Sequence, residues 1–265
     1  GVLATFTTDR LEAMVDRLRR MVAARERDDL ARRLVAGIHI EGPFISPEDG
    51  YRGAHPVDGI RPPDLDAMER LLEAAGGLTR VVTLAPEYDE RLRLTRLLAD
   101  RGVVVAAGHC NPTLEVLRAA CDAGLSMFTH LGNGCADLVP RHDNIIERAL
   151  SLRDRLWLCF IADGEHVPYF VLGNWLRAAG TDRACVVTDA LAPAGVGPGT
   201  YRHKMYEVRV ADDGVARLPD GSLVGGAISM RQAAANLVEH VGLSQDEVRR
   251  LTVTNPRRAI GLDGA

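Results

Sequence analysis

Short runs of β-branched and other apolar residues alternate along this chain with longer segments in which apolar residues recur every three or four positions. Seven of the runs have the length and composition of buried strands: Val2–Phe6, Leu34–Ile40, Thr79–Leu84, Val103–Ala107, Leu125–Thr129, Trp157–Ala162 and Ala184–Thr188. Segments between them, such as Leu11–Met21, Met68–Ala75 and Leu114–Ala123, have helical spacing. This alternation predicts a parallel sheet with helical connections, either open and doubly wound or closed into a barrel.

The polar residues favour the barrel. They follow the ends of several different strands: His39, Glu41, His109, His130, Asp163 and Asp189. Functional groups that converge from many strand ends are typical of a barrel mouth, whereas an open sheet gathers them near one switch point. We therefore expect an α/β fold of the (β/α)8 TIM type. Only seven core strands are found, so one strand is missing or overlooked.

The remaining signals concern chain organisation. Gly242 stands where a helix ends, Ser244 and Glu247 have the spacing of a capping box, and Pro256 can begin a further helical turn. A polar, alternating stretch at residues 201–224, around Asp212–Gly214, predicts a β-hairpin insertion. We expect a single domain over residues 1–265.

Composition narrows the class of protein. The 265 residues are 46% hydrophobic and 26% charged, with a net charge of −4 and dispersed basic residues, which argues against nucleic-acid binding. No apolar run approaches the roughly 18 residues of a membrane span, and no basic-then-apolar leader opens the chain. The five cysteines are odd in number and lack CxxC spacing. They therefore argue against a disulfide framework and a cysteine zinc site, and favour the cytoplasm.

Glu41, His109 and His130 are candidate metal ligands. Each ends an apolar strand, and histidines on neighbouring parallel strands stand about 5 Å apart, within reach of one ion. Two histidines and a glutamate leave a position open for water, as catalytic zinc sites do. A single histidine at a strand end is more often structural, and a carboxylate there can instead bond the following loop.

Asp189 also ends a strand and could transfer a proton beside a metal-activated water, or it could cap a helix. Candidate substrate-binding residues cluster in the same segments: His55, Asn133, Arg141, His142 and His166, with Gly132, Gly134 and Gly164 among them. The guanidinium of Arg141 matches a phosphate, although a lone arginine in a loop is commonly only solvated.

These motifs resemble the N-acetylglucosamine-6-phosphate deacetylases of the amidohydrolase superfamily. The resemblance runs in order through most of the chain: Gly37–His55 (with G-I-H-I-E-G-P-F), Gly108–Asn111, Thr129–Asn133 (T-H-L-G-N), Ile161–Val167, Val187–Gly195, Gly221–Met230 and Leu251–Asp263. It implies a metal-dependent hydrolase on a TIM-type barrel that releases acetate from an amino-sugar phosphate in amino-sugar catabolism.

The resemblance also implies roles for individual residues. Glu41, His109 and His130 would bind one divalent metal, zinc in many members, with iron, manganese or cobalt as alternatives, and Asp189 would shuttle the proton. His55 would polarise the acetyl carbonyl. Substrate contacts carry over to a set of loop residues: Ala54, His55, Asn133, Gly134, Arg141, His166, Leu223, Val224 and Gly225. Because such sites include residues of a neighbouring subunit, the resemblance implies a homodimer.

The chain departs from the family pattern in two ways. The first barrel strand, which often carries an HxH metal pair, and a small β-sandwich are expected to be missing. Gly132 stands where relatives place an aromatic residue, and His142-Asp143-Asn144 replaces a Pro-Gly continuation after Arg141. Two further hypotheses therefore stay open: an amidohydrolase for another N-acyl amino sugar or N-acyl amine, and an inactive sugar-phosphate-binding remnant.

Overall fold

The computed structural model describes residues 1–203, 206–211 and 215–262. The chain forms two compact units, which we treat separately. The first unit comprises Gly1–Thr129 and Gly134–Leu156, and the second unit comprises His130–Asn133 and Trp157–Ala265.

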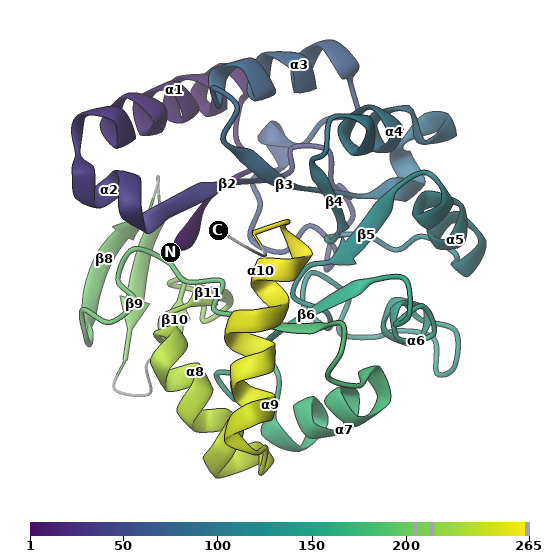
Figure 1. Ribbon diagram of the computed structural model, residues 1–265, viewed down its shortest axis with the longest axis vertical. Coiled ribbons are helices and arrows are strands. Elements are labelled where there is room, and N and C mark those ends of the chain that lie inside the picture. Colours follow the sequence, from purple (N-terminus) through teal and green to yellow (C-terminus); the bar gives the residue numbers. More distant parts are fainter. Residues whose placement is uncertain (204–205, 212–214, 263–265) are drawn as a thin grey trace. The chain divides into compact units, whose positions relative to one another are not determined.

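The first unit is a series of parallel strands connected by helices. Its strands are β1 (Val2–Thr7), β2 (Val35–Glu41), β3 (Thr79–Leu84), β4 (Val104–Ala107) and β5 (Leu125–Phe128). Each strand pairs in parallel with the next one along the chain. The α-helices are α1 (Leu11–Arg27), α2 (Asp29–Leu34), α3 (Leu65–Ala74), α4 (Arg93–Asp100), α5 (Leu114–Asp122) and α6 (Ile145–Leu150). Short 3-10 turns are η1 (Val57–Gly59), η2 (Pro86–Tyr88) and η3 (Glu90–Leu92). Helices α1, α3, α4 and α5 follow one another along the outer side of these strands (Figure 1).

Burial explains why these runs become strands and helices. Val81, Val82 and Leu84 of β3 are all buried, as expected of a parallel strand that is covered on both faces. Helix α1 buries Met14, Val15 and Leu18 along one stripe. Side chains of Asp64, Thr113 and Asn144 accept bonds from the first free backbone N–H groups of α3, α5 and α6. The register of β2, β3 and β4 places Glu41 and the residues after Ala107 at the carboxyl ends of neighbouring strands.

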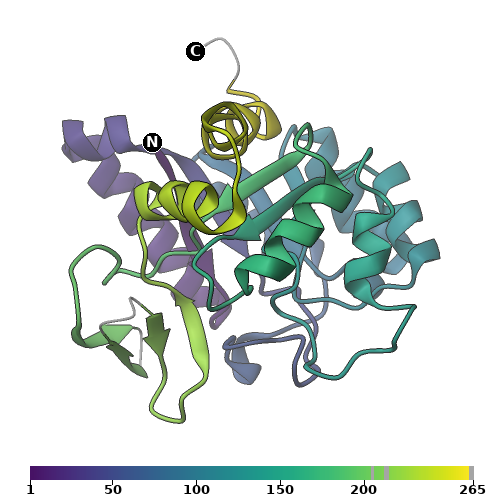
Figure 2. The same ribbon diagram turned by 90° about the horizontal axis from the view of Figure 1, so that it is seen from below.

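The second unit combines two parallel strands with a small antiparallel sheet. Strand β6 (Trp157–Ile161) pairs in parallel with β7 (Ala184–Val187) after helix α7 (Tyr169–Ala179). The antiparallel sheet contains β8 (Gly199–His203), β9 (Tyr206–Val210), β10 (Val215–Arg217) and β11 (Leu223–Gly226). The chain then continues through α8 (Met230–Asn236), η4 (Leu237–Val241), α9 (Gln245–Arg249), η5 (Arg250–Thr254) and α10 (Asn255–Ala259). Figure 2 shows the small sheet with helix α8 leaving from its last strand.

Most predicted elements are confirmed. All seven strands and the three helices lie where the pattern places them, and the Ser244–Glu247 capping box forms. Gly242 ends η4 in the left-handed conformation, and Pro256 lies in the first turn of α10. The region predicted as a hairpin holds the four-stranded sheet, because Val208, Val210 and Ala216 give it a buried core of its own. The predicted turn at Asp212–Gly214 lies outside the described residues.

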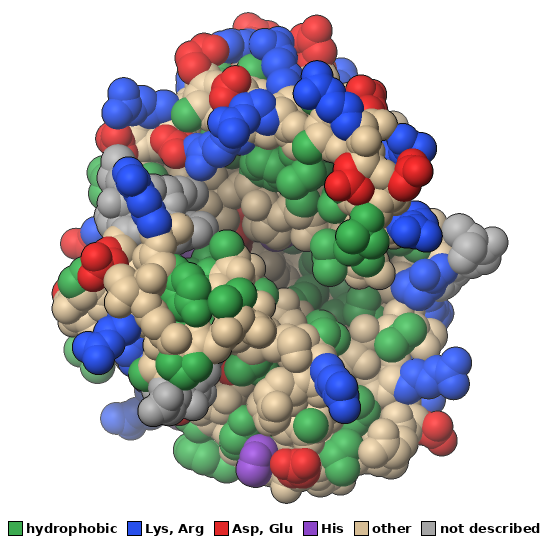
Figure 3. Space-filling model, turned by 90° about the vertical axis from the view of Figure 1, so that its left-hand side faces the viewer, with side chains coloured by type: hydrophobic (Ala, Val, Ile, Leu, Met, Phe, Trp, Pro, Cys, Tyr) green, Lys and Arg blue, Asp and Glu red, His purple; other side chains and the backbone are tan. Residues whose placement is uncertain are grey.

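Strands that are neighbours in sequence are neighbours in the sheet within each unit, with helical connections between them. This is the order of a TIM-type fold, whereas a doubly wound sheet reverses its order at a switch point. Within the described residues, the helices are too short or too polar to cross a membrane. On the face in Figure 3, basic side chains gather at the upper end, where acidic side chains stand among them, and lie farther apart elsewhere.

Candidate active site

Glu41, His55 and His109 meet at one point in the first unit. Glu41 is the last residue of β2, His109 lies in the loop after β4, and His55 lies in the long loop between β2 and α3. Each offers one ligand atom, and these atoms all lie within 4.8 Å of one another. The three residues are only 3%, 8% and 7% exposed. A buried carboxylate in such a cluster requires a compensating positive charge, which a cation or a protonated imidazole can supply.

The ring of His109 is oriented from its Nδ1 side. Nδ1 lies 3.0 Å from the carbonyl oxygen of Tyr51, and Nε2 lies 3.2 Å from Oε1 of Glu41. A carbonyl can only accept, so Nδ1 of His109 carries a proton and donates it, and Nε2 is the ring nitrogen that faces the cluster. Gly134 has a positive φ, and a Cβ there would lie 2.6 Å from Nδ1. Glycine at position 134 therefore makes room for this ring.

His55 is fixed in a similar way. Its Nδ1 lies 2.7 Å from the hydroxyl oxygen of Thr8, and the ring centroids of His55 and His109 are 4.3 Å apart. The sequence predicts His55 as a substrate contact, and the structure adds it to the metal-ligand cluster. Hydrophobic periodicity contains no signal for this, because His55 lies in a loop whose path depends on tertiary contacts.

The arrangement fits a divalent metal. Two ligands at the usual 2.0–2.2 Å from a tetrahedral ion stand about 3.3–3.6 Å apart, close to the 3.2 Å that separates Nε2 of His109 from Oε1 of Glu41. Imidazole and carboxylate donors suit zinc and also iron, manganese or cobalt.

His130 and Asp189 belong to the second unit. His130 directly precedes a tight turn, in which the backbone N–H of Asn133 donates to its carbonyl at 2.9 Å. Asp189 follows β7, and its carbonyl accepts a bond from Gly226 N at 2.8 Å. The structure thus brings the predicted proton shuttle next to the predicted substrate turn at Leu223–Gly225.

Backbone strain marks three of these positions. His109, His130 and Asp189 have φ values of 52°, 29° and 47°. Positive φ is uncommon for residues other than glycine, and strained positions cluster at functional sites. All three follow parallel strands, where the unusual conformation turns the side chain at the strand end.

His166 forms an ion pair with Asp163 in the second unit. Nδ1 of His166 lies 2.6 Å from Oδ2 of Asp163, and Oδ1 accepts from the backbone N–H groups of Glu165 and His166. Burial alone would raise the pKa of Asp163, but the hydrogen bonds and the charge of His166 outweigh it, so the pKa lies below its ordinary value. This pair leaves Nε2 of His166 for a ligand.

Packing explains why position 132 is a glycine. A Cβ at this position would lie 2.4 Å from the ring of Trp175, which projects from α7. Asn133 lies beside Gly132, with its amide nitrogen 3.2 Å from the carbonyl oxygen of His130.

The other predicted contacts lie in loops of the first unit. Ala54 is exposed and adjoins His55, and Gly134 adjoins His109. Arg141 is exposed and forms no ion pair within the described part of the chain. The departure at Asp143-Asn144 is also explained: Oδ1 of Asn144 accepts bonds from Ile146 N and Glu147 N and so begins α6.

Sequence reasoning missed Glu87, which follows β3. Its Oε1 accepts a bond from Asn111 N at 2.5 Å, two residues after His109. Burial raises its pKa to about 7. Nothing in the periodicity distinguishes this glutamate from a solvated one.

Comparison with known proteins agrees with these features. No family model matches the chain. It is 33% identical over 239 residues to N-acetylglucosamine-6-phosphate deacetylase of Bacillus subtilis, a match that covers 90% of this chain and 59% of the relative. It is 34% identical over 230 residues to N-acetylgalactosamine-6-phosphate deacetylase of Escherichia coli O157:H7, covering 87% and 60%. The chain thus spans about three fifths of the length of these relatives.

Solved structures give the same result. A D267A mutant of N-acetyl-D-glucosamine-6-phosphate deacetylase from Mycobacterium smegmatis, in complex with N-acetyl-D-glucosamine-6-phosphate, superposes with a TM-score of 0.88 at 32% identity, covering 98% of this chain and 67% of that one. The enzyme from Thermotoga maritima superposes with a TM-score of 0.84 at 31% identity, covering 98% and 69%. With the shared fold, the sequence identity and the cluster of Glu41, His55 and His109, the chain belongs to the N-acetylglucosamine-6-phosphate deacetylase family.

Proposed function

We propose that this protein is a metal-dependent hydrolase that removes the acetyl group from N-acetylglucosamine-6-phosphate, giving glucosamine-6-phosphate and acetate. The observation that carries the proposal is the buried cluster of Glu41, His55 and His109 in a chain of this family. The five cysteines are all free thiols, which supports a role in cytoplasmic amino-sugar catabolism.

Glu41 and His109 would hold one divalent metal, with His130 as the third ligand that the resemblance implies. Zinc is the first candidate, and iron, manganese and cobalt suit the same donors. When bound, such an ion polarises an amide carbonyl and activates a water molecule. The donation from His109 Nδ1 to Tyr51 keeps Nε2 available for this role.

Asp189 would accept a proton from the attacking water and deliver it to the departing amine. His55, held at Nδ1 by Thr8, would donate from Nε2 to the acetyl oxygen as negative charge develops there. Arg141 and His166 would bind the phosphate, because one is an exposed cation and the other is fixed by Asp163. Further substrate contacts would come from the loop residues Ala54, Asn133 and Gly134 and from Leu223, Val224 and Gly225 of strand β11.

A second substrate is favoured by one specific observation. The Escherichia coli relative, at 34% identity, is an N-acetylgalactosamine-6-phosphate deacetylase, and Gly132 of this chain stands where the family resemblance implies an aromatic residue. The 4-epimer is therefore the alternative sugar. We also infer a homodimer, as the family resemblance implies, which sedimentation velocity can test.

Elemental analysis coupled to an acetate-release assay tests the function. The panel contains the 6-phosphates of N-acetylglucosamine and N-acetylgalactosamine, both free sugars and one non-sugar N-acetyl amine. We expect about one divalent ion per chain and the highest kcat/KM on N-acetylglucosamine-6-phosphate. A higher kcat/KM on N-acetylgalactosamine-6-phosphate would make that sugar the substrate. Turnover of the non-sugar amide alone would refute both sugar phosphates as substrates. Absence of metal, with a melting temperature unchanged by zinc, would indicate an inactive remnant.

The Asp189→Asn variant tests the proton shuttle. Asparagine keeps the shape but cannot carry the proton, so we expect kcat to fall by about 10²–10⁴-fold with the metal content unchanged. Retained turnover would contradict the role of Asp189.

A further inference from the structure

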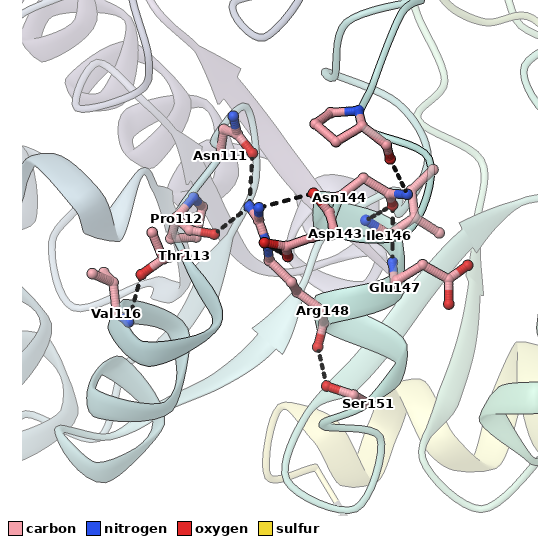
Figure 4. Close-up of polar contacts among 11 residues, drawn as sticks. Asn111, Pro112, Thr113, Val116, Asp143, Asn144, Ile146, Glu147, Arg148 and Ser151 are labelled. Atoms are coloured by element: carbon pink, nitrogen blue, oxygen red, sulfur yellow. Dashed lines mark hydrogen bonds and ion pairs between the residues drawn. The ribbon is translucent and has the colours of Figure 1, made fainter.

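Arg148 connects two loops of the first unit that the proposed function uses separately. It lies on α6, and Figure 4 shows its guanidinium between the Asn111–Pro112 segment and Asp143. Nη1 donates to Oδ1 of Asn111 and to the carbonyl oxygen of Pro112, both at 3.0 Å. Nε donates to Oδ1 of Asp143 at 2.6 Å, and Nη2 donates to the carbonyl oxygen of Asp143 at 3.0 Å.

The two connected loops carry different parts of the candidate site. Asn111 lies two residues after His109, and Asp143 lies two residues after Arg141. The carbonyl oxygen of His109 also accepts from Ser46 N at 2.9 Å, and Asn111 N donates to Glu87 at 2.5 Å. The loop of the metal ligand is therefore fixed on one side by the β2 and β3 loops and on the other by Arg148.

These contacts require arginine. They use four of the five N–H donors of a planar guanidinium, aimed at acceptors on both sides of it. A lysine ammonium concentrates its donors at one point and cannot bridge both segments. The side chain of Arg148 is 12% exposed, whereas that of Asp143 is 78% exposed. An ion pair with so exposed a carboxylate adds little stability, so the main effect of the contacts is to fix the two backbones relative to each other.

We propose that Arg148 is a positioning residue that locks the segment presenting Arg141 to the loop carrying His109. The inference rests on the proposed function for the identity of the anion that Arg141 binds, but the lock itself is a property of the protein without ligand. It links anion capture to metal ligation, since disturbing either segment disturbs the other through one side chain. This linkage also gives a reason for Asp143 in this chain, because its side chain and its carbonyl oxygen both accept from Arg148.

The test uses four variants of the full protein: Arg148→Met, Arg148→Lys, Asn111→Ala and, as the matched control, Arg101→Met. Arg101 forms a two-bond ion pair with Glu69 between α3 and the end of α4, and it touches neither loop. Hydrogen exchange by mass spectrometry reports on peptides covering residues 108–113 and 138–146 without substrate. Zinc affinity and the KM and kcat for N-acetylglucosamine-6-phosphate are measured on the same samples.

In Arg148→Met, exchange should accelerate in both peptides, and zinc affinity should fall about tenfold, the usual effect of losing a contact behind a metal ligand. KM for the phosphorylated sugar should rise about tenfold, while KM for free N-acetylglucosamine changes less than twofold. Arg148→Lys should behave like Arg148→Met, because charge alone does not restore the fork. Asn111→Ala should show a smaller change in both peptides, and Arg101→Met should show none.

Faster exchange in only one of the two peptides, or wild-type behaviour of Arg148→Lys, would overturn the proposal. If Arg148→Met does not fold, Arg148→Lys and Asn111→Ala decide it by the same criteria. A wild-type protein that ignores the phosphorylated sugar would refute the proposed function alone, because the exchange and zinc measurements still test the lock.

Discussion

Each unit contains a buried carboxylate beside an imidazole, and the two pairs are built differently. In the second unit, Asp163 accepts from its own turn and from Nδ1 of His166 at 2.6 Å. In the first unit, Glu41 faces Nε2 of His109 at 3.2 Å, and Nδ1 is held by a backbone carbonyl. A carboxylate close to a histidine is thus not enough to define a metal site. The nitrogen that faces the carboxylate, and the presence of further donors such as His55, distinguish the two pairs.

The largest predicted effect is a difference in bound metal between variants of the two carboxylates. Glu41→Gln removes the negative donor from the cluster, so we expect loss of bound metal and a fall in kcat/KM of about 10³-fold or more, equivalent to several kcal/mol of transition-state stabilisation. Asp163→Asn should keep the metal. Elemental analysis of both proteins makes the comparison, and equal metal loss in the two would show that they are not distinct.

The second prediction concerns the packing of position 132 against Trp175 in the second unit. Gly132→Phe places a side chain against Trp175 at a position with φ of 91°, so we expect a loss of about 3 kcal/mol in the free energy of unfolding. Denaturant unfolding measures it. Combined with Trp175→Ala, the cost should be smaller than the sum of the single changes by about 1 kcal/mol or more. Strict additivity would mean that the two residues do not share this space.

The pKa of Glu87 in the first unit is raised, whereas that of Asp163 in the second unit is lowered. The pKa of Glu87 is raised from 4.5 to about 7, so the folded state binds the proton more tightly than the unfolded chain. This difference in proton binding adds up to about 3 kcal/mol to the free energy of unfolding. The stabilisation is full below about pH 4.5 and is lost as the pH rises to about 7. Glu87→Gln can still accept from Asn111 N, and it should be more stable than wild type at pH 8 but not at pH 4.5. Urea unfolding at both values tests this, and an equal difference at both would refute it.

The smallest effect concerns the support of His55. Thr8→Val removes the hydroxyl that lies 2.7 Å from Nδ1 of His55 but preserves the shape of the side chain. We expect transition-state stabilisation to fall by about 1 kcal/mol, which lowers kcat about fivefold while the metal is retained. Thr8→Ser, which keeps the hydroxyl, is the control. Metal loss in Thr8→Val would assign His55 to the ligands instead.

The sequence predicts the parts that depend on local periodicity. The strand of Glu41 and the strand before His109 are mostly apolar runs on either side of β3, and parallel pairing places their carboxyl ends at the same edge of the sheet, so this half of the cluster follows from pattern. Local periodicity predicts a hairpin in residues 201–224 but not a four-stranded sheet, because that sheet depends on a buried core of its own, which includes Val208 and Ala216.

His55, Glu87 and Arg148 show the limit of such reasoning. Each lies in a loop or on a short helix and has a partner 24 to 54 residues away, so no period in the chain connects them. Their roles depend on which polar groups the folded loops bury together, which is a tertiary property. Trp175 is a similar case, because its contact with Gly132 joins a helix to a distant turn.

The left-handed backbone at His109, His130 and Asp189 has a consequence for selection experiments. Each non-glycine residue in this region carries a cost of about 1 kcal/mol or more that glycine does not. A library selected only for thermal stability, with no demand for turnover, should therefore enrich glycine at these three codons. The enriched positions would trace the active site without any substrate, because here the fold and its chemistry are in direct competition.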